Sequence, residues 1–160
     1  MLRDLPTEVS IRRADANDSA TLAALRWEWR LERYPDAVET FDEFAAAFES
    51  WWAPRMASHH AFVVVDGDDF VGMAFLALVD RVPDPGNHSR IHADLQSVYL
   101  QPAYRGRGIG TELVRRLVRS ARAAGCDKVT VHSGTRALPL YVREGFIAHN
   151  RLLELDLTTE

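Results

Sequence analysis

The stretch Tyr104–Glu112, YRGRGIGTE, carries three glycines at alternate positions with two arginines between them. It follows a strand-like run and precedes a segment whose apolar residues recur as on one face of a helix. A glycine-rich turn of this kind exposes backbone N–H groups at the positive end of the helix dipole, where they bind anionic phosphate. Because the turn lies between two strong elements rather than between domains, its position argues against a flexible linker.

Two nucleotide-binding motifs fit this turn poorly. A Rossmann fingerprint requires its last glycine at residue 111 or 113, where the sequence has Thr111 and Leu113. That fingerprint also belongs to a parallel β-α-β unit, whereas three consecutive predicted strands precede this turn. A Walker loop requires a lysine, which the turn lacks. We therefore expect a phosphate ligand of another kind.

The composition limits the class of protein. The chain has 160 residues, enough for one domain with a full hydrophobic core. A formal net charge of -4 does not favour nucleic acid, whose binding domains are usually basic. The single cysteine excludes an internal disulfide and a Cys-based zinc site, so we predict no metal. No apolar run approaches the ~20 residues that cross a bilayer, and the first ten residues do not resemble a signal peptide. We expect a cytoplasmic protein that binds no membrane.

Hydrophobic periodicity and turn residues predict the element order β-α-α-β-β-β-α-β-α-β. Strands are expected at 8–14, on either side of the turn Asp66–Asp69, and at 91–100, 128–133 and 152–157. The first helix is expected to run from a cap at Asp15, Asn17, Asp18 or Ser19 to about Arg33, and further helices are expected at 41–53, 109–124 and 137–144. Thr40 and Glu43 have the spacing of a capping box at the start of the second helix. Antiparallel strands followed by a β-α-β unit predict a mixed α/β (α+β) sheet with helices on both faces.

The segment VYLQPAYRGRGIGTELVRRLV, residues 98–118, resembles the acetyl-coenzyme A motif of the GNAT N-acetyltransferase superfamily. The family pattern Gln/Arg-x-x-Gly-x-Gly/Ala reads here Arg105-x-x-Gly108-x-Gly110. Residues 9–26 are similar to the family's opening strand and helix, and residues 138–146 to its Tyr-x-x-x-Gly-Phe element. The resemblance implies a single N-acetyltransferase domain over 1–160, with a mostly antiparallel sheet and one splayed pair of strands.

The resemblance implies that acetyl-coenzyme A is the acetyl donor. Backbone N–H groups from Arg105 to Thr111 would cradle its pyrophosphate, and Val98 and Leu100 would bind its pantetheine arm through backbone hydrogen bonds. A main-chain N–H near Leu100 would polarise the thioester carbonyl. The implied cofactor-binding residues are Val98, Tyr99, Leu100, Arg105, Gly106, Arg107, Gly108, Ile109, Gly110 and Thr111. The arginines on the polar side of the following helix, Arg115, Arg116, Arg119 and Arg122, either contact the 3′-phosphate or form a solvated face.

The resemblance also implies direct transfer, in which an amine attacks the thioester without a covalent enzyme intermediate. Tyr141 matches the tyrosine that protonates the departing thiolate; otherwise it is a buried aromatic residue. Asp94 corresponds to an acidic position that serves as a base in some members, and His92 is a second candidate on the same strand face. The alternative for Asp94 is an ion pair with an arginine. A non-catalytic acyl-coenzyme A sensor is the competing function, against which the presence of Tyr141 and Asp94 argues.

In this family the first two helices usually wall the acceptor pocket. The candidate substrate-binding residues are Trp27, Glu28, Tyr34 and His92. Trp27 and Trp29 lie about 200° apart on a helix, so one of them is expected to face the cleft. The acidic residues of this region and the overall charge favour a cationic amine, although they also fit a solvated helix face. A small amine or antibiotic, an amino acid and a peptide amine stay open as acceptors, and a homodimer fits the family.

Overall fold

The computed structural model of the chain describes residues 9–36, 38–149 and 153–158. Five strands form one sheet in the order β1-β2-β3-β4-β5, antiparallel except for the parallel pair β4 and β5. The elements are β1 (Val9–Arg13), α1 (Ser19–Arg33), α2 (Phe41–Trp52), β2 (His59–Asp66), β3 (Asp69–Arg81), β4 (Arg90–Leu100), α3 (Ile109–Ala123), β5 (Lys128–Val131) and α4 (Leu138–Arg143), with 3-10 turns at Ala16–Asp18, Ala53–Arg55 and Pro102–Tyr104. The predicted mixed, mostly antiparallel sheet is confirmed.

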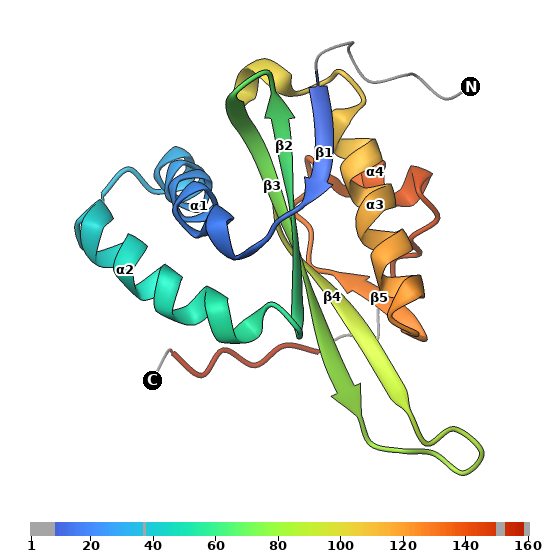
Figure 1. Ribbon diagram of the computed structural model, residues 1–160. Helices are drawn as coiled ribbons and strands as arrows, with labels where there is room; N and C mark the ends of the chain where they lie inside the picture. Colours follow the sequence, from blue (N-terminus) through green and yellow to red (C-terminus); the bar gives the residue numbers. More distant parts are fainter. Residues whose placement is uncertain (1–8, 37, 150–152, 159–160) are drawn as a thin grey trace.

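Helices cover both faces of the sheet, with α1 and α2 on one side and α3 and α4 on the other (Figure 1). Side chains alternate along each strand, so the central strands contribute to two separate cores. Val63 and Met73 pack with Trp52 beneath α1 and α2. Val64, the next residue on β2, packs with Leu113 beneath α3. Among the described helices, none is long and apolar enough to cross a membrane.

The last predicted strand does not form over residues 153–158, which are irregular. Leu153, Leu155 and Leu157 remain 91%, 80% and 86% exposed, so their alternation with acidic residues buries no apolar face. Alternation produces a strand only where a sheet edge pairs with it, and these residues lie on no edge. Leu152, and Glu8 at the start of the first predicted strand, lie outside the described residues.

Local signals in the sequence are confirmed at two turns. The Thr40 hydroxyl accepts from the Glu43 N–H at 3.3 Å, and the Glu43 carboxylate accepts from the Thr40 N–H at 2.8 Å. Thr40 is the N-cap residue of this capping box, and α2 begins at the next residue, Phe41. The turn between Asp66 and Asp69 closes the β2–β3 hairpin, with Gly67 in the left-handed conformation at φ 58°.

A bulge interrupts β4 between its two halves. Met73 on β3 pairs with Tyr99 and Phe75 pairs with Gln96, so three steps along β4 match two along β3. The bulge contains Ser97, which has a positive φ of 53° although it is not glycine. Pairing between β4 and β5 runs only from His92 to Leu95, and the bulge begins after the next residue, Gln96. Beyond the bulge β4 continues without β5, which creates the splayed strands.

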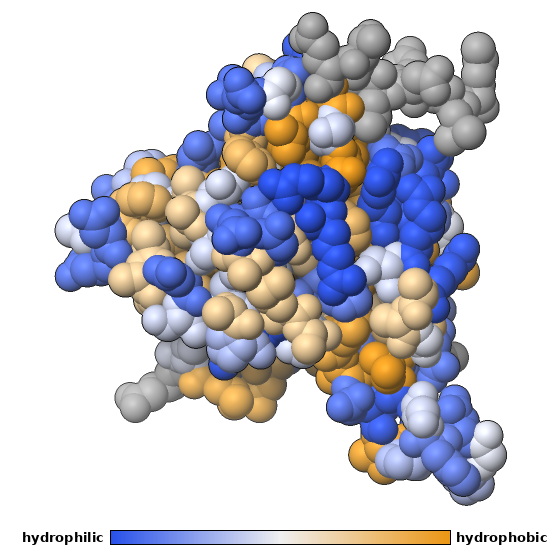
Figure 2. Space-filling model, viewed as in Figure 1, coloured by the Kyte–Doolittle hydropathy of each residue, from blue (hydrophilic) through white to orange (hydrophobic). Residues whose placement is uncertain are grey.

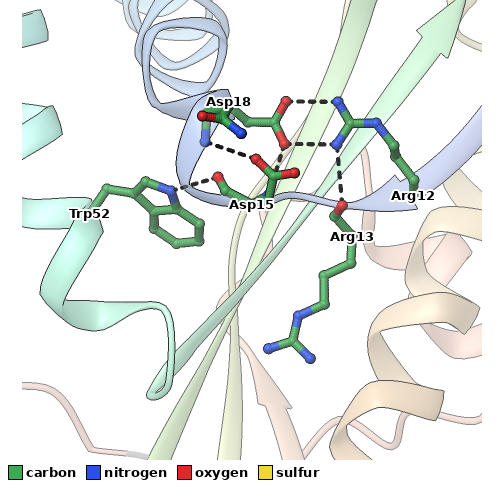
Figure 3. A network of polar contacts seen from close by, with 6 residues as sticks. Arg12, Arg13, Asp15, Asp18 and Trp52 are labelled. Atoms are coloured by element: carbon green, nitrogen blue, oxygen red, sulfur yellow. Dashed lines mark hydrogen bonds and ion pairs between the residues drawn. The ribbon is translucent and has the colours of Figure 1, made fainter.

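A polar network connects the end of β1 to the start of α1 and the end of α2 (Figure 3). The Arg12 guanidinium donates two hydrogen bonds to Asp18, both 2.7 Å long, and a third to the Arg13 carbonyl at 3.2 Å. Asp18 also accepts from the Asp15 N–H at 2.8 Å, and the Asp15 carbonyl accepts from the Trp52 indole at 3.2 Å. The hydrogen bonds from Arg12 hold the pKa of the buried Asp18 carboxyl below its usual value, against the effect of burial. The network fixes where α1 and α2 leave the sheet.

We predict that Asp18→Asn lowers the free energy of unfolding by about 1–3 kcal/mol at neutral pH, because the buried residue 18 loses its charge-assisted hydrogen bonds to Arg12. The folded-state pKa of Asp18 lies below its unfolded-state value of about 3.9. The stabilisation is therefore complete above that value and is lost as the pH falls through the folded-state pKa. Urea unfolding over a pH series should show the difference between wild type and variant shrinking in acid. Asp80→Asn, an exposed change on β3, should alter stability by less than about 0.5 kcal/mol.

Candidate acetyl-transfer site

A pocket of about 420 Å³ lies where β4 and β5 separate. From the α1 side of the sheet it is lined by Trp29 and Arg33, and from the other side by Tyr141 of α4. The β4 residues on its wall include Ser97 and Val98 at the bulge. Continued pairing of the strands would close the sheet here, so the gap allows side chains from both faces to line one pocket.

Tyr141 lies in α4 and is 5% exposed. Its ring packs edge to face on Phe146 with ring centroids 5.5 Å apart. Burial raises the pKa of the Tyr141 phenol above its usual value, so the hydroxyl keeps its proton at neutral pH. The phenol is therefore positioned in the pocket in its proton-donating form.

The glycine turn presents a row of free backbone donors. The N–H groups from Gly106 to Thr111 have no hydrogen-bond acceptor within the part of the chain that the structure describes. Gly106 and Gly108 adopt left-handed conformations at φ 73° and 85°, and Gly108 is the N-cap residue that directly precedes α3. Successive N–H groups that alternate between such conformations form a concave anion site, which the helix dipole reinforces. The donors present fit a pyrophosphate.

Arg105 differs from this row. Its N–H donates to the Pro102 carbonyl at 3.3 Å, and its side chain turns back to the Leu100 carbonyl at 2.9 Å and to Glu32 of α1 at 2.6 Å. The cradle of free donors consequently starts at Gly106, one residue later than the sequence predicts. Arg105 instead links the cradle to the acceptor-side helix.

Three of the arginines of α3 are paired with acidic residues, either on α3 itself or at the end of α4. Arg115 donates two hydrogen bonds to Glu144, at 2.7 and 3.0 Å, while Arg116 and Arg119 share Glu112 at 3.0 and 2.6 Å. Hydrophilic residues gather over α3 on the surface in Figure 2. The geometry favours the solvated-face interpretation of these arginines over a dedicated phosphate site.

The candidate bases lie on β4 outside the pocket wall. Asp94 is half-buried and accepts from the Gln96 amide at 2.9 Å and from the Thr130 hydroxyl at 3.3 Å. His92 is three residues, or about 10 Å along the strand, from Leu95 on the pocket wall. Partial burial, together with neighbouring cationic side chains, lowers the pKa of His92, which favours its neutral form. Asp94 is nearer to the pocket than His92.

The two tryptophans of α1 lie on opposite sides of the helix, as their spacing of two residues predicts. Trp27 packs against Phe41 and Phe44 of α2, with ring centroids 5.8 and 5.7 Å apart. Trp29, on the opposite side of the helix, lines the pocket. The structure therefore places Trp29, rather than the predicted Trp27, at the site, because α2 covers the Trp27 side of α1.

Glu28 and Tyr34 also lie outside the pocket wall. The Glu28 carboxylate accepts a hydrogen bond from the Gln101 side chain at 3.0 Å. Tyr34 is 51% exposed and is flanked by Arg30 and Arg33, whose guanidinium carbons lie 4.2 and 5.5 Å from its ring centroid. Neither side chain therefore lines the pocket that contains Tyr141.

Sequence reasoning missed a large part of the pocket. The loop between β5 and α4, residues 132–137, forms one wall, and Arg33 and Ser97 form others. The loop combines small residues with His132 and Arg136 but has no local motif, and the bulge at Ser97 carries no glycine to signal it. The only available signal was the expected splaying of the strands, which predicts that residues on both sides of the gap face it.

Comparison with known proteins gives a consistent result. The family model described as "Acetyltransferase (GNAT) family" matches residues 22–146. A "Glucosamine 6-phosphate N-acetyltransferase" of Trypanosoma brucei brucei is 37% identical over 87 residues, which cover 54% of this chain and 57% of that relative. A "Probable glucosamine 6-phosphate N-acetyltransferase 2" of Oryza sativa subsp. japonica is 32% identical over 145 residues, covering 87% of this chain and 82% of the relative. The chain therefore spans little more than half of the trypanosome protein and most of the rice protein.

Solved structures share the fold. A predicted acetyltransferase from Clostridium acetobutylicum, crystallised with acetyl-CoA, superimposes with a TM-score of 0.80 at 21% identity, covering 94% of this chain and 97% of that one. A Trypanosoma brucei acetyltransferase has a TM-score of 0.71 at 26% identity, with coverage of 93% and 99%. Since the family model matches most of its length, the chain belongs to the GNAT family of acetyltransferases.

Proposed function

We propose that the protein transfers an acetyl group from acetyl-coenzyme A to a primary amine by direct attack of the amine on the thioester. The observation that carries this proposal is the free row of N–H groups from Gly106 to Thr111 beside a pocket that holds a protonated phenol. The row supplies an anion cradle for the pyrophosphate. The unpaired edge of β4 beyond Leu95, including Val98, Tyr99 and Leu100, supplies backbone groups for the pantetheine arm.

Acetyl-coenzyme A supplies an activated acyl group when it is bound. Residues of the chain donate a proton to the leaving group and accept a proton from the amine. The neutral amine forms a C–N bond to the carbonyl carbon as the C–S bond breaks and its electrons move to sulfur. Tyr141 donates its phenolic proton to the departing thiolate. A base accepts the proton released by the amine. We assign this role to Asp94 acting through water, since Asp94 directly precedes the pocket residue Leu95 on β4 but does not line the pocket itself.

The competing function is a non-catalytic acyl-coenzyme A sensor on the same fold. Release of free thiol from acetyl-coenzyme A, measured with and without a panel of amines, separates the two functions. Amine-dependent release supports the transferase, and tight binding of coenzyme A without release for any amine supports the sensor. Three relatives are named for glucosamine 6-phosphate, so this amine belongs in the panel beside amino acids, small polyamines and peptide amines.

We predict that Tyr141→Phe lowers kcat by about a hundredfold, because the departing thiolate loses its proton donor. The hydroxyl has no hydrogen-bond partner in the described part of the chain, so the variant should keep its melting temperature and its affinity for coenzyme A. Steady-state kinetics and calorimetric titration of coenzyme A measure the two properties. An unchanged kcat would remove Tyr141 from the mechanism.

We predict that Gly108→Ala weakens coenzyme A binding by about tenfold or more, because φ 85° is costly for alanine and the cradle depends on this conformation. Gly125→Ala is the matched control, since Gly125 has φ 77° just beyond the opposite end of α3 and an added Cβ also meets open space there. Both variants should lose similar stability, but only Gly108→Ala should lose affinity in calorimetry. Arg107→Ala should weaken binding less than Gly108→Ala. Equal affinities for the two glycine variants would contradict the cradle.

We predict that Asp94→Asn removes the acidic limb of the pH profile of kcat/KM, because that limb reports protonation of the base in the free enzyme. His92→Gln should retain the limb, since His92 lies further from the pocket. Profiles of the three proteins with one amine acceptor make the comparison. A limb that disappears in His92→Gln and persists in Asp94→Asn would reverse the assignment.

A further inference from the structure

The pocket wall is cationic although the chain as a whole is acidic, with a formal net charge of -4. Arg33 reaches the wall from the end of α1, and Arg136 and His132 reach it from the loop between β5 and α4. None of the described residues that line the pocket is an aspartate or glutamate. A wall of this charge attracts anions.

The nearest carboxylates do not neutralise this wall. Glu32 is bound to Arg105 at 2.6 Å and approaches Arg136 only to 4.0 Å. Glu154 lies 3.6 Å from His132, and both side chains are largely exposed. Exposed pairs at these distances contribute little, so Arg136 remains available to a ligand.

Arg26 extends the same positive stripe along α1. Arg26 and Arg33 are seven residues apart, which places them within about 20° on the helix and about 10 Å apart along its axis. The Arg26 guanidinium stacks 4.2 Å from the ring centroid of Trp29, which lines the pocket. Its Nη1 atom is buried and has no hydrogen-bond partner among the described residues. Burial, with Arg30 nearby, lowers the pKa of Arg26, but a guanidinium still keeps its charge at neutral pH.

An unpaired charge in a half-buried position destabilises the fold unless an anion approaches it. Arg26 occupies the side of α1 that faces the sheet, between the buried Leu22 and the pocket residue Trp29. An apolar residue would fill this position without that cost. Stacking on Trp29 offsets part of this cost, and an anion bound near Trp29 would offset more of it.

We propose that the amine acceptor carries an anionic group, a phosphate or a carboxylate, which Arg33 and Arg136 bind at the pocket wall while Arg26 strengthens the positive potential behind Trp29. This inference rests on the proposed acetyl transfer and names the acceptor class of the same pocket. Because Tyr141 and Arg33 line one pocket, the amine and the anion of a single small molecule occupy it together.

The acidic residues of α1 predicted a cationic acceptor, whereas the pocket wall favours an acceptor with an anionic group. Glu28 is bonded to Gln101 and Glu32 to Arg105, so both carboxylates serve contacts within the protein. Neither lines the pocket. The charge that faces the acceptor is that of the arginines on the other side of α1.

The test compares two pairs of amines that differ in one anionic group: glucosamine 6-phosphate against glucosamine, and phenylalanine against phenylalaninamide. Thiol release gives kcat/KM for each amine with wild type, Arg33→Met and Arg26→Met. Wild type should favour the anionic member of one pair by about tenfold or more, as expected for a charge-assisted contact. Each variant should lose this preference, because kcat/KM should fall about tenfold more for the anionic member than for the neutral member. The pair that shows the preference tells phosphate from carboxylate.

Two controls separate binding from folding. Arg33 is exposed, so Arg33→Met should fold like wild type. Arg26→Met removes an unpaired buried charge and should leave the melting temperature unchanged or raise it, whereas a structural role would lower it. Arg81→Met removes an exposed charge from the far end of β3 and should keep the preference.

Equal kcat/KM for both members of both pairs in wild type would overturn the proposal, as would an equal loss on both members in the arginine variants. Calorimetric titration of glucosamine 6-phosphate and of phenylalanine, with coenzyme A present, tests the site without turnover. Binding that weakens about tenfold in Arg33→Met supports the anion site even where no thiol is released, and that combination counts against acetyl transfer alone. Failure of both probes to bind wild type overturns the anion site.

Discussion

The bulge in β4 determines what the rest of the molecule can do. Two parallel strands in a closed sheet satisfy each other's backbone groups and leave no opening between them. One extra residue at Ser97 turns β4 away from β5 after Leu95, and the sheet opens. The opening exposes a strand edge to a ligand and gives the two faces of the sheet a common pocket. Without the bulge, Tyr141 and Trp29 would belong to separate cores on opposite sides of a barrier.

The two ends of the site rely on different parts of the chain. The anion cradle consists of backbone N–H groups whose direction depends on the conformation of the glycines at its turn. The proposed acceptor end depends on side chains from α1, α4 and the β5–α4 loop, which line the pocket. A backbone site tolerates few sequences at the turn, whereas a side-chain site changes its preference by substitution at positions such as Arg33. The arrangement allows the donor to stay constant while acceptors differ.

The sequence was informative where a local rule sets the structure. The glycine turn, the capping box at Thr40 and the β2–β3 hairpin depend on neighbouring residues, and each appears at or within a residue of its predicted place. The irregular tail after Leu153 and the bulge at Ser97 depend on pairing between distant segments, which local alternation does not encode. The choice of Trp29 over Trp27 depends on the side of α1 that α2 covers. The anion-binding turn was predicted from its own residues and Tyr141 from a resemblance, whereas Arg33 and the β5–α4 loop required the structure.

All four tryptophans of the chain lie in the two helices on the acceptor side, at Trp27, Trp29, Trp51 and Trp52. Trp52 is anchored to the Asp15 carbonyl in the network that joins these helices to β1, and Trp29 lines the pocket. The cradle side contains tyrosine and phenylalanine but no tryptophan. Light absorbed by indole alone is therefore emitted only from the α1–α2 half of the molecule. Trp29 therefore gives the pocket an intrinsic fluorescence signal, whereas the turn Gly106–Thr111 has no tryptophan of its own.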